Sequence, residues 1–258
     1  MTAPNSSARK PSTHGPVGVA VLVGFGLFSV TVSSWLIGLV IEVGGGYFFW
    51  HGQGIRHAQE MVQQDLRYIA AAPRSLLVPD TVDFSLRIVK WVRMPYERLG
   101  ALRWYQRNLA AQQAGTDAAL PSFLGQSVQP QLKGLAKAGS SFIHMLSEWV
   151  VISMFVLQDV LLRLCTAVFA LPAFALACLM GVIDGLVRRD RRRWQGGRES
   201  SFVYHHAKRY VGWALTGGFG LYLSWPFGGF NPAYMVLVFT VLVAFTLSTT
   251  VGAFKKYA

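Results

Sequence analysis

Few side chains in this sequence have the types and spacing that chemistry requires. His205 and His206 are adjacent, but neighbours on a helix point about 100° apart, and no carboxylate or thiol lies at metal-ligand spacing from them. No phosphate-binding loop, HExxH motif, GxSxG motif or paired-carboxylate arrangement occurs. We therefore expect neither an enzyme nor a cofactor. An enzyme that uses His205 and Glu199 is the most remote alternative.

Three ionisable residues interrupt otherwise apolar runs: Asp159, Arg163 and Asp184. An ionisable residue in a membrane span suggests a transport path. A small transporter or channel-like protein is therefore the alternative function, and it requires these three side chains to line one aqueous path. Asp184 comes four residues before Arg188, however, and can pair with it close to the membrane surface.

The composition indicates an integral membrane protein. Of the 258 residues, 14% are charged and 52% are hydrophobic, and the mean hydropathy is +0.36. Soluble domains carry about 25% charged residues, and several apolar runs here reach the roughly 20 residues that a membrane-spanning helix needs. The net charge of +12 suits nucleic acid, anionic lipid or control of topology, and the positions of the charges must decide among them.

The N-terminal half predicts one span followed by an extramembrane segment. Residues 17–41 are free of charges and predict the first transmembrane helix, with a hinge at Gly44 to Gly46 after it. Residues 42–148 carry charges of both signs on amphipathic patterns, which predicts a helical periplasmic segment. Within it, Asp80 is a plausible N-cap, and Pro95 should kink or divide its helix.

Residues 149–187 form an ambiguous apolar run. It is either one long helix, of which only about 164–187 spans the membrane, or two spans in a tight hairpin. The loop that follows, residues 188–209, carries eight Lys and Arg against two Asp and Glu, and the positive-inside rule places it in the cytoplasm. With the basic N-terminal tail also inside, an even number of crossings precedes the loop, which favours the single long helix. Whether 149–163 lies in or on the membrane stays open.

Two more spans follow the basic loop and complete an all-α protein with four transmembrane helices and both termini in the cytoplasm. The predicted segments are a cytoplasmic tail (1–16), the first span (17–41), the periplasmic helical segment (42–148), the long helix with the second span (149–187), the basic cytoplasmic loop (188–209), the third span (210–227), the fourth span (234–254) and a cytoplasmic end (255–258).

Small residues recur every fourth position in the second span. Helices in a membrane associate by close backbone approach, which small side chains permit. This stripe predicts a helix contact, with the third span or across a dimer, and it consists of Ala173, Ala177, Gly181 and Gly185. The two cysteines, Cys165 and Cys178, lie in the same run and are expected to be small packing residues.

A dense basic segment follows the second span. Near a bilayer, basic side chains are attracted to anionic headgroups and an interfacial tryptophan anchors the chain. The predicted lipid and topology residues are Arg188, Arg189, Arg191, Arg192, Arg193 and Trp194. Contact with a protein and contact with nucleic acid are the alternatives for these charges, and we expect no direct nucleic-acid binding.

The next block, residues 196–209, contains acidic, aromatic and histidine residues that neither topology nor lipid binding requires. Both depend chiefly on basic charge and are indifferent to acidic, aromatic and histidine residues. The block therefore predicts a docking surface for a partner protein, with candidate residues Arg198, Glu199, Phe202, Tyr204 and His206.

Three stretches of this sequence, residues 184–190, 196–209 and 254–257, resemble the integrating conjugative element membrane proteins, a bacterial family of unknown molecular function. The likeness extends to Ile41-Glu42 and Phe49-Trp50. It implies an inner-membrane protein encoded on mobile DNA that works alongside a type IV secretion apparatus and its coupling ATPase. It supplies no catalytic residues. We therefore expect a non-enzymatic accessory protein of conjugative transfer, whose partners are membrane proteins of that machinery, the coupling ATPase, anionic lipid and a second copy of itself.

Overall fold

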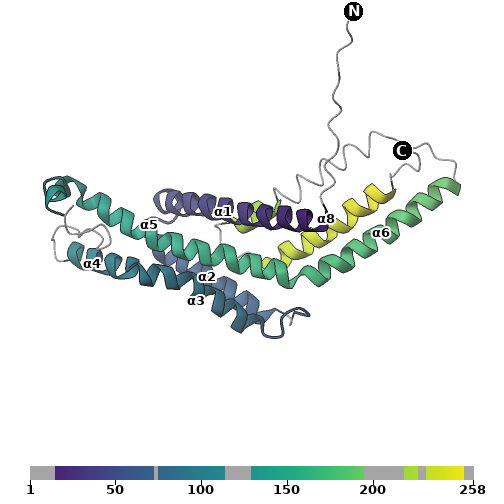
Figure 1. Cartoon of the computed structure of the whole chain (residues 1–258), viewed down its shortest axis with the longest axis horizontal. Helices are drawn as coiled ribbons and strands as arrows, with labels where there is room; N and C mark the ends of the chain where they lie inside the picture. Colours follow the sequence, from purple (N-terminus) through teal and green to yellow (C-terminus); the bar gives the residue numbers. More distant parts are fainter. Residues whose placement is uncertain (1–14, 73–74, 114–128, 195–217, 226–230, 253–258) are drawn as a thin grey trace, which may run out of the picture.

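The computed structural model describes residues 15–72, 75–113, 129–194, 218–225 and 231–252. Every regular element within these ranges is a helix (Figure 1), so the predicted all-α fold is confirmed. Among the described residues, four helices are long and apolar enough to cross a membrane, by length and composition: Val17–Phe48, Phe142–Phe169, Leu171–Arg191 and Pro232–Gly252.

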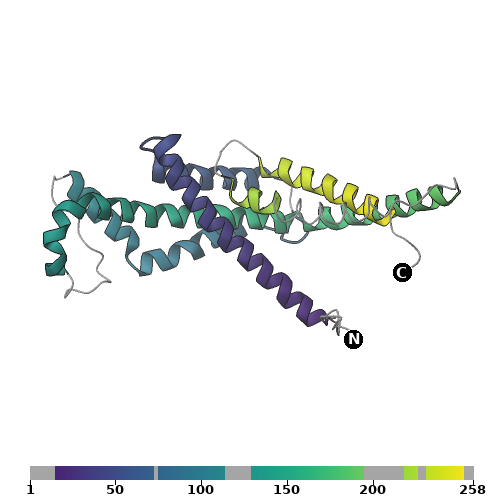
Figure 2. The same ribbon diagram turned by 90° about the horizontal axis from the view of Figure 1, so that it is seen from above.

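The first helix, α1 (Pro16–Phe48), crosses the central helix α5 (Gln129–Phe169) (Figure 2). Its N-terminal half exposes apolar side chains, whereas its C-terminal half packs on α5. At the crossing, a Cβ on Gly38 would lie 3.0 Å from Cγ1 of Val156, so glycine allows the two helices to approach closely. The indole N–H of Trp35 fixes the crossing by donating to the carbonyl of Ser153 at 3.0 Å.

The predicted hinge at Gly44 to Gly46 is replaced by a continuous helix that runs through all three glycines. The indole of Trp50 folds back over Gly45, where a Cβ would clash with its Cζ2 atom. The backbone N–H groups of Phe49 and Trp50 both donate to the Gly45 carbonyl and close the helix. Gly45 therefore provides space for an indole rather than flexibility.

Three amphipathic helices form a layer against α5: α2 (Gly54–Ala71), α3 (Thr81–Arg98) and α4 (Ala101–Gln113). Asp80 caps α3 as predicted, accepting a hydrogen bond from the backbone N–H of Asp83 at 2.9 Å. Pro95 does not divide α3, because it lies in the last turn, where its missing N–H removes a single helical bond. The helices separate instead at Gly100, which has a φ of 72°.

The central helix α5 buries much of its apolar surface against other helices of the protein. Helices α1, α2, α3 and α4 all pack on it. Half of its most apolar window is buried, against 11% in α1, 11% in the helix that follows and 17% in the last helix. Length and composition alone would make α5 a span, but its surroundings are those of a core helix.

A bend separates α5 from α6 (Leu171–Trp194) at Ala170. Pro172 has no N–H to donate to the turn before it, which ends α5. Two backbone bonds of 3.1 Å, Ala170 N to Thr166 O and Phe174 N to Ala170 O, carry the chain across the break. The long helix predicted over 149–187 is therefore two helices that meet at a wide angle (Figure 1) rather than one rod or a tight hairpin.

The last helix, α8 (Pro232–Gly252), packs beside α6 and runs parallel to it, because Gly181 faces Ala244 and Gly185 faces Ser248. The chain between Trp194 and Pro232 must therefore return to the beginning of α6. Residues 218–223 are helical, and Tyr222 and Leu223 are buried against α5. Most of the third span predicted at 210–227 lies outside the described residues.

Candidate functional site

A buried guanidinium connects three parts of the chain at the centre of the molecule. Arg163 of α5 donates from Nε to Oδ2 of Asp65 in α2 at 3.1 Å, and its Nη2 lies 3.0 Å from Oδ2 of Asp159, one turn earlier in α5. Its Nη1 donates to the carbonyls of Tyr222, at 3.2 Å, and Trp225. Arg163 thus joins α2 and α5 and caps the end of the helical residues 218–223.

The charges of this cluster are costly to bury, so their pairing determines its effect on stability. Arg163 and Asp65 expose only 7% and 8% of their side chains. A buried ion pair stabilises a fold only when its geometry is good and its remaining polar atoms are bonded. Among the described residues, Oδ1 of Asp159 is buried without a hydrogen-bond partner. It lines a cavity of about 20 Å³ together with Glu42, which has space for about one water molecule.

A second polar link joins α1 to α2. Oε1 of Glu42 lies 2.6 Å from Nδ1 of His57, and the carboxylate is almost fully buried. The ring of Trp50 stacks on His57 with 4.1 Å between centroids and 11° between planes. The first apolar helix is therefore attached to the amphipathic layer by one charged group and one aromatic stack.

The sequence indicated Arg163 and Asp159 but not their partners. Asp65 lies on the face of α2 that also carries the buried Val62 and Ile69. A carboxylate within an apolar stripe is a signal for a buried partner, but the pattern does not say which cation supplies it. Glu42 gave a similar signal at the end of an apolar run, and nothing local indicated His57.

The three ionisable residues that a transport path would require are not brought together. Asp159 and Arg163 pair with each other. Asp184 lies on α6 beyond the bend, half-exposed, and its Oδ2 accepts hydrogen bonds from Arg188 Nε at 2.8 Å and from the hydroxyl of Ser248. The described residues therefore do not assemble the path that the alternative function needs.

The small-residue stripe of α6 faces α8 over most of its length. A Cβ on Gly181 would lie 2.6 Å from the carbonyl oxygen of Ala244, and one on Gly185 would lie 2.8 Å from that of Ser248. Ala177 is buried and Ala173 is exposed. Within the described residues, the contact lies inside one chain and involves the fourth predicted span. A Cβ on Gly220, in the described part of the third predicted span, would meet no described atom within 4 Å.

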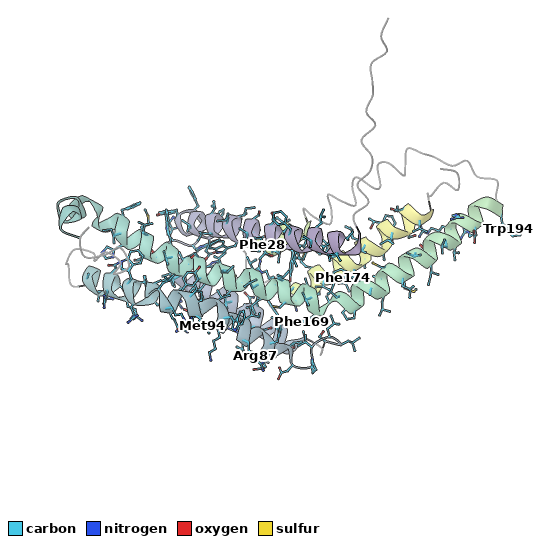
Figure 3. All side chains as sticks on the ribbon, viewed as in Figure 1. Phe28, Arg87, Met94, Phe169, Phe174 and Trp194 are labelled. Atoms are coloured by element: carbon cyan, nitrogen blue, oxygen red, sulfur yellow. The ribbon has the colours of Figure 1, made fainter. Side chains whose placement is uncertain are left out.

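The basic segment predicted for lipid contact forms the C-terminal end of α6. Arg188 and Arg191 are exposed, and Arg189 is half-buried. Trp194 is 91% exposed at the far end of the helix (Figure 3). The side chains of Arg192 and Arg193 lie outside the described set, as does the whole predicted docking block with Arg198, Glu199, Phe202, Tyr204 and His206.

Fold and site together define a class: in its described residues, an all-helical protein with four helices apolar enough to cross a membrane, attached to an amphipathic layer by a buried Glu42–His57 contact and a buried Arg163–Asp65 ion pair. A family model described as "IncC plasmid conjugative DNA transfer protein DtrJ-like" matches residues 49–255. The chain therefore belongs to this DtrJ-like family of conjugative DNA transfer proteins. No curated protein and no solved structure matches it. The predicted relation to conjugation is confirmed, and the link to integrating conjugative elements in particular stays a prediction.

Proposed function

We propose that this protein is a non-enzymatic accessory component of conjugative DNA transfer in the bacterial inner membrane, and that it acts by assembly with other membrane proteins of a type IV secretion apparatus. The observation that carries the proposal is the match to conjugative DNA transfer proteins over residues 49–255. The apolar surfaces of α1, α6 and α8 support it, since few of the residues in their apolar windows are buried by the rest of the chain.

The proposed topology places both termini and the basic end of α6 in the cytoplasm and the layer of α2, α3 and α4 in the periplasm. In Figures 1 and 2 the beginning of α1, the end of α6 and the end of α8 point toward one end of the molecule, and the layer lies toward the other. The parallel orientation of α6 and α8 also supports this topology. Two parallel helices require the chain between them to cross back to the side where α6 begins, and a span over 210–227 would make that crossing.

In this arrangement α5 is the support of the periplasmic layer rather than a separate span. The amphipathic helices cover it on several sides, and its charged cluster at Arg163 is neutralised by α2 instead of facing lipid. The boundary of the membrane then falls near the bend at Ala170. The basic block that follows α6 is the proposed docking surface for a cytoplasmic or membrane-bound partner, the coupling ATPase being one such partner.

The proposal can be tested in a donor cell that carries the complete mobile element. A deletion of the gene should abolish or strongly reduce transfer, and expression of the tagged protein from a separate plasmid should restore it. The tagged protein, solubilised from isolated inner membranes, should purify with membrane proteins of the secretion apparatus. Normal transfer in the deletion strain would overturn the proposal. So would purification of the tagged protein without any protein of the secretion apparatus, from a strain in which the tagged protein restores transfer.

A further inference from the structure

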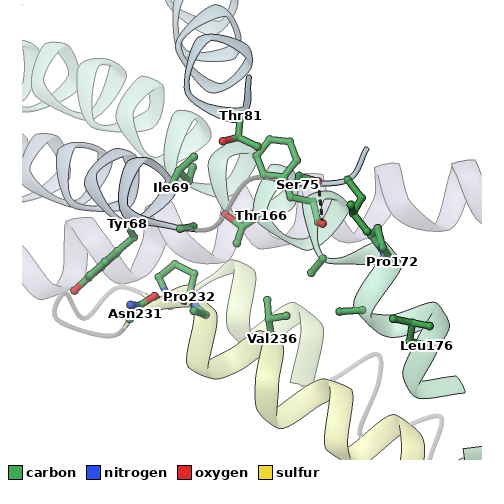
Figure 4. Close-up of a pocket in the computed structure, with 16 residues that line it drawn as sticks. Tyr68, Ile69, Ser75, Thr81, Thr166, Pro172, Leu176, Asn231, Pro232 and Val236 are labelled. Carbon is green, nitrogen blue, oxygen red and sulfur yellow. Dashed lines mark hydrogen bonds between the residues drawn. The ribbon is translucent and has the colours of Figure 1, made fainter. Parts of the chain in front are cut away.

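A pocket of about 370 Å³ lies where the amphipathic layer meets α6 and α8 (Figure 4). Its walls come from the end of α2, the beginning of α3, the bend between α5 and α6, and the first turns of α8. The volume is within the range of small-molecule sites, about 300–1,000 Å³. The pocket belongs neither to the Arg163 cluster nor to the basic end of α6.

Three hydroxyl groups around this pocket already make hydrogen bonds within the protein. The hydroxyl of Thr166 donates to the Leu162 carbonyl at 3.1 Å, and that of Ser75 donates to the Phe169 carbonyl at 3.2 Å. The phenol of Tyr68 accepts a hydrogen bond from Gln64 at 2.8 Å. The hydroxyls of Thr166 and Ser75 therefore offer no free donor to a polar ligand. Apolar side chains supply much of the remaining lining, including Ile69, Pro172, Leu176 and Val236.

The pocket is continuous with the apolar surface that the candidate membrane helices expose. Leu176 lines the pocket and is 62% exposed at the same time. On the same two helices, Leu179 of α6 and Leu237 and Val238 of α8 are also largely exposed. A hydrocarbon chain in contact with α6 and α8 can therefore enter the pocket without crossing a polar barrier.

Three occupancies of such a pocket differ in free energy. An empty apolar cavity loses dispersion contacts along its whole lining. Water is a poor occupant, because it needs two to four polar partners that an apolar cavity does not supply. A lipid chain restores the dispersion contacts and is present at high local concentration wherever α6 and α8 lie in a bilayer.

We propose that this pocket binds an acyl chain of a membrane phospholipid. The chain lies against Pro172 and Leu176, and its polar end is directed toward Tyr68 and Asn231, which form the opposite end of the pocket in Figure 4. Because Phe169, Ala170 and Pro172 are part of the lining, the bound chain also packs the bend between α5 and α6.

The experiment uses the full-length protein in vesicles of phosphatidylethanolamine and phosphatidylglycerol that contain a trace of a phospholipid with a diazirine in its acyl chain. After irradiation, labelled residues are located by mass spectrometry. Labelling should concentrate on peptides that line the pocket. Ala173→Trp on α6 and Ala72→Trp at the end of α2 fill the pocket from two different elements and should each lower that labelling by at least about fivefold. Ala175→Trp, on an exposed position of the same helix outside the pocket, should leave it unchanged.

Two results would overturn the proposal. Labelling spread evenly along the exposed faces of α6 and α8, and equal in wild type and filling variants, would show only lipid that surrounds the protein. Absence of labelling on the pocket peptides of the wild type, together with a lower melting temperature of both filling variants, would show that another part of the chain or a partner helix occupies the pocket. The labelling pattern of the wild-type protein decides the first case without any variant.

Discussion

Arg163 of α5 and Asp65 of α2 lie 98 positions apart in the sequence and form a buried ion pair, with 3.1 Å between Nε and Oδ2. This pair joins the amphipathic layer to the central helix. Because the same guanidinium also binds the carbonyls of Tyr222 and Trp225, the position of the chain just before α8 depends on it too.

Removal of the Asp65 carboxylate should destabilise the protein strongly. Asp65→Ala leaves the Arg163 charge buried with less compensation, and loss of one partner of a buried pair costs about 3–5 kcal/mol. The melting temperature of the purified protein in detergent measures the effect. The matched control is Glu60→Ala in the same helix, which removes an exposed partner of Arg56 and should cost about 0–1 kcal/mol. Equal melting temperatures for both variants would contradict the role assigned to the pair.

Two neighbouring glycines of α1 should respond oppositely to alanine. Gly45→Ala places a methyl group where it clashes with the Trp50 ring, which displaces the indole from His57 and should cost about 1–3 kcal/mol. Gly44→Ala meets no described atom within 4 Å and should be neutral or stabilise the helix by up to about 1 kcal/mol. Thermal unfolding of the two variants measures the difference, and the reverse order of stability would show that the indole does not lie over Gly45.

A bulky residue in the α6 stripe should separate α6 from α8. In Gly181→Leu, even the Cβ of the new side chain would lie 2.6 Å from the carbonyl oxygen of Ala244. Such overpacking costs about 1–3 kcal/mol. Leu179→Ile, at an exposed position of the same helix, is the control. Protein abundance in membranes and the frequency of conjugative transfer should fall for Gly181→Leu alone. Equal abundance and transfer for both variants would mean that the stripe is not a tight interface.

The topology can be tested with single cysteines in a background that lacks Cys165 and Cys178. A cysteine at Gln113, exposed at the end of α4, should react with a membrane-impermeant maleimide added to intact cells whose outer membrane is permeable to it. A cysteine at Gln195, just after α6, should react only after the inner membrane is opened. Reaction of both positions from the same side would refute the proposed orientation.

The docking block can be separated from the role of charge by a triple variant. Replacement of Glu199, Tyr204 and His206 by alanine keeps every basic residue of the loop, so insertion and abundance should stay normal. Conjugative transfer should fall, since the removed side chains are those that a partner surface would use. Normal transfer at normal abundance would leave the loop as an element of topology and lipid binding only.

Local patterns in the sequence were sufficient to predict the first and the last of the described helices. The charge-free run at 17–41 and the hydroxyl-containing run at 234–254 correspond to α1 and α8, and the N-cap at Asp80 follows from residue type and position. The bend at Ala170 was also accessible in principle, because Pro172 stands in the middle of the predicted long helix and proline interrupts helical hydrogen bonding.

The site could be predicted only in part, because its contacts join distant positions. Apolar periodicity marks Asp65 as a charge on a buried face, but only the packing of α2 on α5 identifies Arg163 as its partner. Composition likewise makes α5 and α6 equally good spans. The amphipathic helices cover more of α5 than of α6. This difference arises from tertiary packing, which local sequence patterns do not reveal.

Because of the bend at Ala170, a change in the angle between α5 and α6 moves the far end of α5. With 41 residues, and a rise of about 1.5 Å per residue, this helix is about 60 Å long. A change of about 10° in the angle between α5 and α6 therefore displaces the far end of α5, and the helices packed there, by about 10 Å. A small rearrangement of packing around Pro172 is thus converted into a movement the width of a helix at the opposite end of the protein.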